Sequence, residues 1–269
     1  MKKIWSLSGL LAACCFAASA NAGVMVTQWA FTLNGSWSGA TFGSGGGAQT
    51  QNATEISWGE SGADMKTVGS GRSGLEITNA NAAGMVNTNG AAAVTNTITH
   101  YNNVVNGGYA TMLTAGLDSS LSLTPVLPVP GPLIGPTVIN FVINFAETSN
   151  SAPCGFPSGS VCDDIFVIDK GSLNNQFVYD GFTYFVSFFE STNNLTPLPA
   201  ATCAAANVAA GCLGLTTQEG QFTPATFVFT VTSRPVGIPL PGSLFLLGIG
   251  LLGLAVARRP APARLSRAR

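Results

Sequence analysis

Strict alternation of apolar and polar side chains most constrains the fold of this chain. Between residues 139 and 145, isoleucine or phenylalanine occupies every odd position, and asparagine or valine every even one. A period of two places each set of side chains on one face of a β-strand. The chain is also rich in glycine, threonine, asparagine, serine, valine and phenylalanine, and helix-favouring residues are scarce before residue 237. The sequence therefore predicts an all-β fold.

Other segments have the same strand-like composition, and no helix is evident before residue 237. Strands are expected at 29–33, 55–59, 75–78, 94–105, 164–168, 176–179, 182–190 and 222–232. A Tyr-Asp-Gly-Phe turn at 179–182 predicts a hairpin, 79–93 is expected to be a long loop, and five prolines between 125 and 136 indicate an extended connector. Many short strands joined by turns are typical of a β-sandwich or jelly roll.

The N-terminus has the features of an export signal. Two lysines precede an apolar segment at 4–18, and Ala20 and Ala22 complete an A-x-A cleavage site. We therefore expect a signal peptide at 1–22, removed by signal peptidase. The rival interpretation is a lipoprotein signal, because the segment 11–14 also ends in a lipobox-like cysteine, Cys14.

The C-terminal segment 236–269 combines a proline motif, an apolar run and an arginine-rich tail. The run 242–257 would span about 24 Å as a helix, close to the bilayer core of about 30 Å. Arg258 and Arg259 follow it directly and are expected to stay cytoplasmic. The segment is either a plain membrane anchor or a transient one removed by a sorting protease.

Residues 238–259 read IPLPGSLFLLGIGLLGLAVARR and resemble the PEP-CTERM sorting signal of Gram-negative bacteria. The resemblance implies recognition by the membrane protease exosortase, with a transient stay in the inner membrane. Pro239, Leu240, Pro241 and Gly242 form the motif, in which Leu240 replaces the usual glutamate. The departure leaves open which exosortase acts and whether cleavage occurs. The chain is thus expected to comprise a signal peptide at 1–22, a single ectodomain at 23–235 and a sorting segment at 236–269.

The expected ectodomain of about 215 residues is acidic. It contains all twelve acidic residues but only four basic ones, so its formal net charge is 4 − 12 = −8. Nucleic-acid binding requires a basic face, and the sequence therefore excludes it as an expected function. A weakly charged, acidic surface suits a soluble domain outside the cytoplasm.

Four cysteines remain after the signal peptide. An even number in an exported chain predicts two disulfides, for which three pairings exist. The short separations favour Cys154–Cys162 and Cys203–Cys212. Zinc binding is the alternative, although separations of eight and nine residues do not suit zinc knuckles.

The chain has one histidine, His100, which the composition predicts to be a hydrogen-bonded structural residue on a strand edge or loop. One histidine cannot form a three-histidine zinc site. Asp163, Asp164 and Asp169 offer oxygen ligands for calcium, but solvated carboxylates flanking a strand are the favoured interpretation. No cofactor or metal is expected.

No nucleophile motif is complete. A glycosidase requires two carboxylates, and the sequence does not select a pair among Asp118, Glu147, Glu190 and Glu219. If exposed, the aromatic side chains of Trp37, Trp58, Tyr101 and Tyr109 would be able to stack on sugars, but packing explains them equally well. The chain is therefore not expected to be an enzyme.

Thr99, His100 and Asn102 lie in the sequence Thr-His-Tyr-Asn, which is similar to the signature of the THxN family of PEP-CTERM proteins. Further segments occur in the order that this family has: Gln-Trp-Ala-Phe at 28–31, Ile-Ser-Trp-Gly at 56–59, Ser-Gly-Leu at 73–75, Cys-Asp-Asp-Ile-Phe-Val at 162–167 and Thr-Gln-Glu at 217–219. The resemblance covers most of the ectodomain and implies an export route, but no biochemical activity.

Taken together, these features predict a non-catalytic structural or adhesive protein of the cell surface or exopolysaccharide matrix. Exopolysaccharide is the expected partner. A calcium-assisted carbohydrate-binding module and a carbohydrate-active hydrolase with an unrecognised carboxylate pair are the alternatives.

Overall fold

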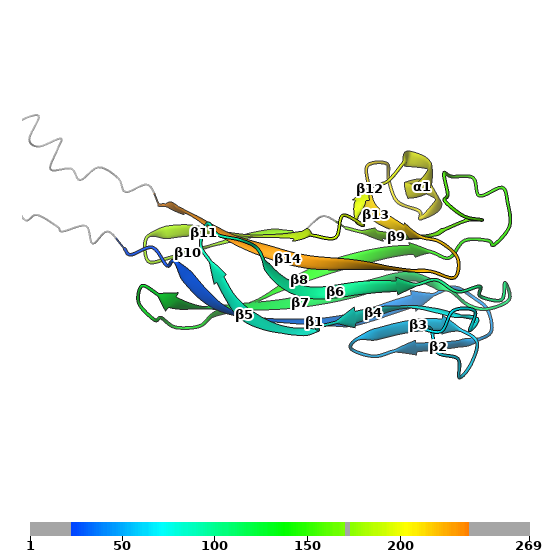
Figure 1. The fold of residues 1–269 in the computed structure, drawn as a ribbon, viewed down its shortest axis with the longest axis horizontal. Coiled ribbons are helices and arrows are strands. Elements are labelled where there is room, and N and C mark those ends of the chain that lie inside the picture. The colour runs from blue at the N-terminus through cyan, green and yellow to red at the C-terminus, as the bar shows by residue number, and fades with distance from the viewer. Residues whose placement is uncertain (1–22, 170–172, 237–269) are drawn as a thin grey trace, which may run out of the picture. The chain divides into compact units, whose positions relative to one another are not determined.

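A computed structural model describes residues 23–169 and 173–236 (Figure 1). The expected signal peptide, with Ala20 and Ala22, and the sorting motif, with Pro239, Leu240, Pro241, Gly242, Arg258 and Arg259, lie outside these residues. No helix within the described ranges is long and apolar enough to cross a membrane. Residues Val24–Pro235 form one compact unit.

Two antiparallel sheets of seven strands each make up this unit, so the expected all-β sandwich is confirmed at the level of fold class. The first sheet has the order β12 (Thr196–Pro197), β13 (Leu213–Thr217), β9 (Asp164–Ile168), β8 (Ile134–Ala146), β7 (Met112–Leu127), β1 (Gln28–Phe42) and β5 (Asn81–Asn87). The second has the order β10 (Asn174–Tyr179), β11 (Phe182–Glu190), β14 (Phe222–Pro235), β6 (Ala93–Tyr101), β4 (Arg72–Thr78), β3 (Glu55–Gly59) and β2 (Ala48–Gln51).

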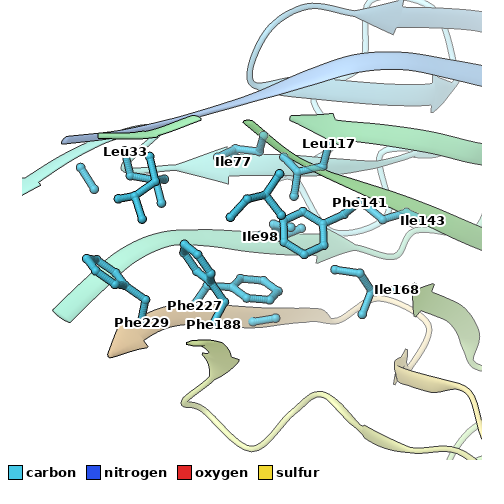
Figure 2. Close-up of a cluster of buried hydrophobic side chains, with 14 of the residues drawn as sticks. Leu33, Ile77, Ile98, Leu117, Phe141, Ile143, Ile168, Phe188, Phe227 and Phe229 are labelled. Atoms are coloured by element: carbon cyan, nitrogen blue, oxygen red, sulfur yellow. The ribbon is translucent and has the colours of Figure 1, made fainter. Parts of the chain in front are cut away.

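Alternation along the strands builds the core between the sheets. Leu33, Leu117 and Phe141 from the first sheet face Ile98 and Phe229 from the second, and all five side chains are buried (Figure 2). Each large apolar side chain that is fully buried stabilises the fold by about 1.5–3 kcal/mol. The odd positions of 139–145 are buried as predicted.

Two segments of the first sheet differ from the prediction. The segment 79–93 contains strand β5, and β7 extends through Pro125. Strand β5 consists mainly of small residues, which have little intrinsic preference for a strand. It forms a strand because it pairs with β1. Pro125 pairs with Trp29 of β1, and it lies beyond the last β7–β8 pair, Leu123–Ile134, so β8 requires no backbone N–H from it.

The expectation of no helix before residue 237 was wrong, because α1 covers Ala200–Ala205. The segment contains four alanines in six residues, and alanine has the highest helix propensity. Pro199 precedes the helix as its N-cap. Cys203 and Thr202 are its buried residues, so packing against the sheet supports a helix too short to be stable alone.

Candidate functional site

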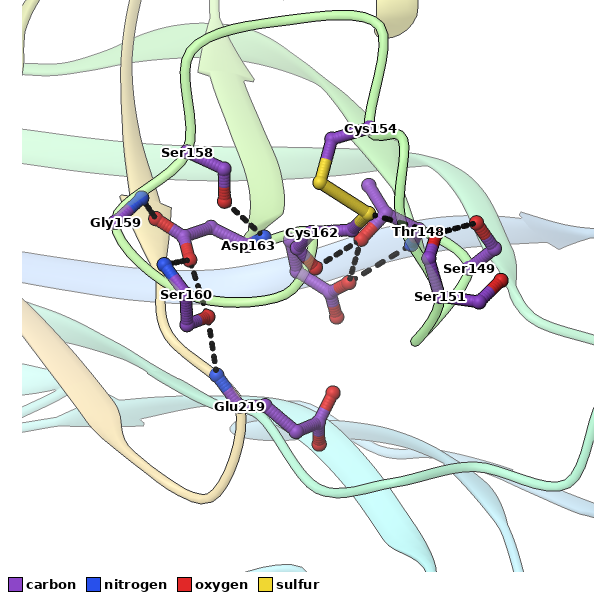
Figure 3. The surroundings of a disulfide bond; sticks show 11 residues. Thr148, Ser149, Ser151, Cys154, Ser158, Gly159, Ser160, Cys162, Asp163 and Glu219 are labelled. Atoms are coloured by element: carbon purple, nitrogen blue, oxygen red, sulfur yellow. Dashed lines mark hydrogen bonds between the residues drawn. A yellow bond between two sulfur atoms is a disulfide. The ribbon is translucent and has the colours of Figure 1, made fainter.

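Both expected disulfides are present. The Cys154–Cys162 bond closes the loop 147–163 between β8 and β9, with a Cα–Cα distance of 5.0 Å (Figure 3). The Cys203–Cys212 bond joins α1 to the chain that enters β13, with a Cα–Cα distance of 5.9 Å. These pairings favour folding in an oxidising compartment.

Four ionisable side chains converge beside the first disulfide: His100, Glu147, Asp164 and Glu219, here named the histidine–carboxyl cluster. They come from β6, from the end of β8, from the start of β9 and from the turn between β13 and β14. The carboxyls of Glu147, Asp164 and Glu219 influence one another electrostatically. The fold thus brings three acids near one another, and one of them, Asp164, lies beside the imidazole.

His100 occupies a different environment from the one predicted. It lies on β6, which is paired on both sides, and its side chain is 1 % exposed. The imidazole packs against Trp58 and Phe145, and neither ring nitrogen has a hydrogen-bond partner among the described residues. Burial lowers the pKa of His100 to about 3. The imidazole is therefore neutral at physiological pH.

Asp164 is 0 % exposed, and the expectation of a solvated carboxylate was wrong for it. Its Oδ1 accepts hydrogen bonds from the backbone N–H and the hydroxyl of Thr148, at 2.8 and 3.3 Å. Its Oδ2 lies 3.9 Å from His100 Nε2. Burial and the adjacent Glu147 carboxyl raise the pKa of Asp164 well above its ordinary range.

Glu147 connects this buried group to the surface. Its Oε2 accepts a hydrogen bond of 2.7 Å from the indole N–H of Trp58, which is completely buried in β3. Burial raises the pKa of Glu147 to about 7, although the Trp58 hydrogen bond opposes the shift. The nearby Glu147 carboxyl also raises the pKa of Asp164 electrostatically. Because each negative charge disfavours the other, one of the two carboxyls is favoured to keep a proton.

Asn102 holds the turn that carries Glu219. The Asn102 side-chain N–H₂ donates to the carbonyl of Thr217 at 2.8 Å, and its backbone bonds to Gly220 and Gln221 at 2.9 Å. Both carboxyl oxygens of Glu219 are buried without a hydrogen-bond partner among the described residues, and burial raises the pKa of Glu219. Figure 3 shows the Glu219 carboxyl directed away from Ser160, which accepts from the Glu219 backbone N–H.

Asp163 is also buried rather than solvated, with an exposure of 3 %. Its carboxylate accepts hydrogen bonds from the backbone N–H groups of Gly159 and Ser160 and from the Ser160 hydroxyl (Figure 3). Although burial opposes the change, these hydrogen bonds lower the pKa of Asp163. The side chain therefore shapes the disulfide loop.

An open polar pocket of about 650 Å³ lies where Glu147 reaches the surface. Its lining consists of Val104, Val105, Asn106, Gly107, Tyr109, Thr111, Glu147, Thr148, Ser149, Asn150 and Ser151. The Tyr109 hydroxyl donates to Glu60 at 2.7 Å, which fixes the ring at the edge of the pocket. Most of the lining is uncharged and capable of hydrogen bonding.

The other candidate residues lie elsewhere. Trp37 is buried in the core, with an exposure of 5 %, so it is not a surface stacking residue. Tyr101 is half-buried and donates to Glu76. Asp118 lies on β7, and Glu190, at the end of β11, accepts hydrogen bonds from Thr192.

Four of the five further segments of the THxN resemblance, 56–59, 73–75, 162–167 and 217–219, adjoin the Thr-His-Tyr-Asn segment in this region. The fifth, 28–31, lies elsewhere, because Trp29 packs against Tyr184. Thr99 is buried on β6, where its Cα partners are Glu76 and Pro224. His100 contacts Trp58 of the segment 56–59 and Asp164 of 162–167, and Asn102 binds the turn at 217–220. Sequence reasoning missed Glu147 as a member, because its nearest partners are separated from it by 17 to 89 positions.

In the parts of the chain with described coordinates, no three His, Cys, Asp or Glu side chains are arranged to hold a metal ion. The aspartates at 163, 164 and 169 therefore do not form a calcium-ligand group. No protein-family model matches the chain, and neither does any curated protein sequence.

Proposed function

We propose that the chain is an exported protein of the cell surface or exopolysaccharide matrix, with a non-catalytic adhesive role, and that its ectodomain binds uncharged carbohydrate in the polar pocket. The chemistry of the pocket lining carries this proposal. Hydroxyl and amide side chains both donate and accept hydrogen bonds, as sugar hydroxyls do. Tyr109 adds an aromatic surface of the kind on which sugar rings pack.

The charge of the pocket favours an uncharged ligand. Glu147 is the one ionisable acid among the lining residues, and the lining includes no lysine, arginine or histidine. Anion recognition generally uses arginine or lysine. An ectodomain with a formal net charge of −8 would also repel acidic polymers. A neutral polysaccharide therefore suits the site better than a uronate-rich one.

The accessibility of the carboxyls supports a binding role over hydrolysis. Glycoside hydrolysis requires two carboxyl groups that flank the scissile bond. Glu147 reaches the pocket, whereas the unpartnered oxygens of Asp164 and Glu219 are shielded from solvent. A sugar in the pocket would thus meet one carboxyl. The calcium-assisted alternative lacks support, because Asp163 is already satisfied by its own loop.

The proposed route begins with cleavage after Ala22 and passes through an inner-membrane intermediate. Exosortase then recognises the motif Pro239 to Gly242 and releases the protein to the surface or matrix. The two disulfides support an oxidising destination. The resemblance to PEP-CTERM signals supports the sorting step.

The binding proposal is tested by retention on insoluble exopolysaccharide from the host. Ser149 is exposed at the pocket, so Ser149→Trp would fill it without replacing a cluster residue. Asn174→Trp, on the exposed edge strand β10, is the matched control. We expect retention of the wild-type chain and the control, and at least a tenfold loss for Ser149→Trp. Equal retention of both variants, or no retention of the wild-type chain, would contradict pocket binding.

A further inference from the structure

We propose that the histidine–carboxyl cluster is a proton-held latch. Protons on Glu147 and Asp164 keep the loop 147–163 closed against the sandwich, and the loop opens more readily as the pH rises. Because this loop supplies one wall of the polar pocket, the latch would regulate the site to which we assign carbohydrate binding. Only the regulation of carbohydrate binding rests on the proposed function.

The cluster contains no compensating positive charge among the described residues. Around Glu147, β3 contributes the Trp58 N–H, β6 the neutral imidazole of His100, β9 the Asp164 carboxyl and the β13–β14 turn the Glu219 carboxyl. None of these is a cation. Ionising a buried carboxyl without a paired charge is strongly unfavourable, so the group retains a proton instead.

The basic side chains among the described residues are engaged elsewhere. Arg72 directs its guanidinium to the hydroxyls of Ser57 and Thr50 and to two carbonyls. Lys66 pairs with Glu76. Arg234 lies over the Phe185 ring. Protons are therefore the positive charges that the described structure makes available to these carboxyls.

The Glu147 and Asp164 carboxyls are close enough to influence each other electrostatically. Asp164 Oδ2 is buried without a hydrogen-bond partner among the described residues, and His100 Nε2 lies 3.9 Å from it. A proton between the carboxyls converts one oxygen into a donor and gives a hydrogen bond. Its removal by hydroxide forms water and leaves two facing carboxylates, which repel each other in a poorly solvated site.

Hydrogen bonds of Thr148 tie the two ends of the loop together. Asp164 accepts the backbone N–H of Thr148, and the Thr148 hydroxyl donates to the carbonyl of Cys162. The disulfide from Cys162 to Cys154 holds the middle of the loop together. Repulsion between Glu147 and Asp164 would therefore displace the loop as a unit, including the pocket wall at 148–151.

The sign of the pH dependence follows from the two states of Glu147. Its pKa is about 7 in the closed state and returns to its ordinary value of about 4.3 when solvent enters. Between these values the closed state holds a proton that the open state releases. Opening is then favoured by about tenfold per pH unit, and the dependence levels off above pH 7 for this residue. Asp164 extends the dependence upward, since its pKa is also raised.

Exposure of His100 would act in the opposite direction. Its pKa is lowered by burial, so an open state that exposed it would take up a proton below about pH 6.5. Comparing each variant with the wild-type chain at the same pH removes this shared contribution. The comparison therefore isolates the protons of the carboxyls.

Amide hydrogen exchange of the purified chain between pH 5 and pH 8, without ligand, tests the latch. The reporter is the Thr148 N–H, whose partner is Asp164. After correction for intrinsic exchange, Glu147 should contribute a rise of about tenfold per pH unit between pH 5 and pH 7 to the opening constant of the wild-type chain. Glu147→Gln should lack this contribution, so its opening constant should change by about tenfold less per pH unit. Asp118→Asn on β7 should show the same pH dependence as the wild-type chain.

Identical pH dependence in the wild-type chain and Glu147→Gln would overturn the latch. Should the variant not fold, infrared spectroscopy of the wild-type chain decides the question. A protonated-carboxyl carbonyl band should be present at pH 6 and weaken as the pH rises through about 7, and its absence at pH 6 would overturn the proposal.

Calcium and zinc at pH 8 are the final control, because either ion would be able to replace the protons. We expect no change in exchange, and restored protection would overturn the proton latch in favour of a cation site. All of these measurements omit carbohydrate. A failure to bind polysaccharide therefore does not affect the test of the latch. A failure of the latch likewise does not affect the test of polysaccharide binding.

Discussion

The His100 Nε2 atom lies 3.9 Å from Asp164 Oδ2, with both side chains almost completely shielded from water. This distance exceeds that of a hydrogen bond, and both groups are neutral, because burial lowers the pKa of His100 and raises that of Asp164. The contact is therefore not an ion pair. It is one edge of a buried polar cluster that stabilises the fold only while its groups are uncharged.

His100→Leu should remove an acid-dependent loss of stability. The pKa of His100 is about 3 in the folded chain and about 6.5 when unfolded. The unfolded state therefore binds an extra proton between these values, and the wild-type chain gains up to about 1.4 kcal/mol per pH unit as the pH rises through the window. In urea unfolding from pH 4 to pH 7, the unfolding free energy of the wild-type chain minus that of the variant should therefore rise with pH up to about pH 6.5.

Above about pH 4.3, Glu147 makes the unfolding free energy fall as the pH rises. The unfolding free energies of the wild-type and variant chains must therefore be compared at each pH. A variant whose unfolding free energy keeps the same pH dependence as the wild-type chain would contradict the neutral assignment of His100.

Trp58→Phe should destabilise the chain more at pH 8 than at pH 5. The variant keeps an aromatic ring but removes the N–H that donates to Glu147. Because a hydrogen bond to the charged carboxylate is lost, we expect a cost of about 1–3 kcal/mol at pH 8, a smaller cost at pH 5, and a pKa of Glu147 above its present value of about 7.

Trp29→Phe is the matched control for Trp58→Phe. Trp29 is also completely buried, but its indole N–H donates to the neutral hydroxyl of Thr88 at 2.9 Å. The cost of this change should not vary with pH over the same range. Equal pH dependence in the two variants would show that the Trp58–Glu147 hydrogen bond has no special electrostatic role.

Asn102→Ala should loosen the turn that carries Glu219. The change removes a buried donor to the carbonyl of Thr217, at a cost of about 1–3 kcal/mol. Asn194→Ala removes a comparable bond of 2.7 Å to the carbonyl of Pro224 in a half-buried position, where water can replace it, and should cost less. Urea unfolding of both variants measures the difference, and a smaller cost for Asn102→Ala would contradict the assignment.

Replacing both Cys203 and Cys212 by alanine should lower the free energy of unfolding by about 2–3 kcal/mol. The bond closes a short loop, and the estimate follows from the lost restriction of the unfolded chain. The measurement is urea unfolding without reductant. A reductant should narrow the gap between wild type and variant, and an unchanged unfolding midpoint in the double variant would contradict a stabilising disulfide.

The sequence predicted the strand segments with strong alternation and the short-range disulfides, since both depend on nearby residues. Strand β7 was missed although its odd positions include the buried residues Leu117, Leu121 and Leu123. The small residues of β5 carry no such signal. They become a strand by pairing with β1.

The candidate site was harder to predict, because its members come together through long-range sheet pairing. His100 and Asp164 are 64 positions apart, and local spacing does not reveal that contact. The family resemblance selected His100, Asn102 and the segment with Asp164, but not Glu147. Asp163 and Asp164 were expected to be solvated, because most aspartates lie on the surface, but both side chains are buried.

The most direct test of the exported matrix protein is its intact mass in membrane, surface and medium fractions of the native host. We predict a mass that starts at Gly23 and ends within 238–242, in the surface or medium fraction, with both disulfides formed. A mass that runs to Arg269 in the inner-membrane fraction would contradict release to the matrix and would define a tethered protein instead.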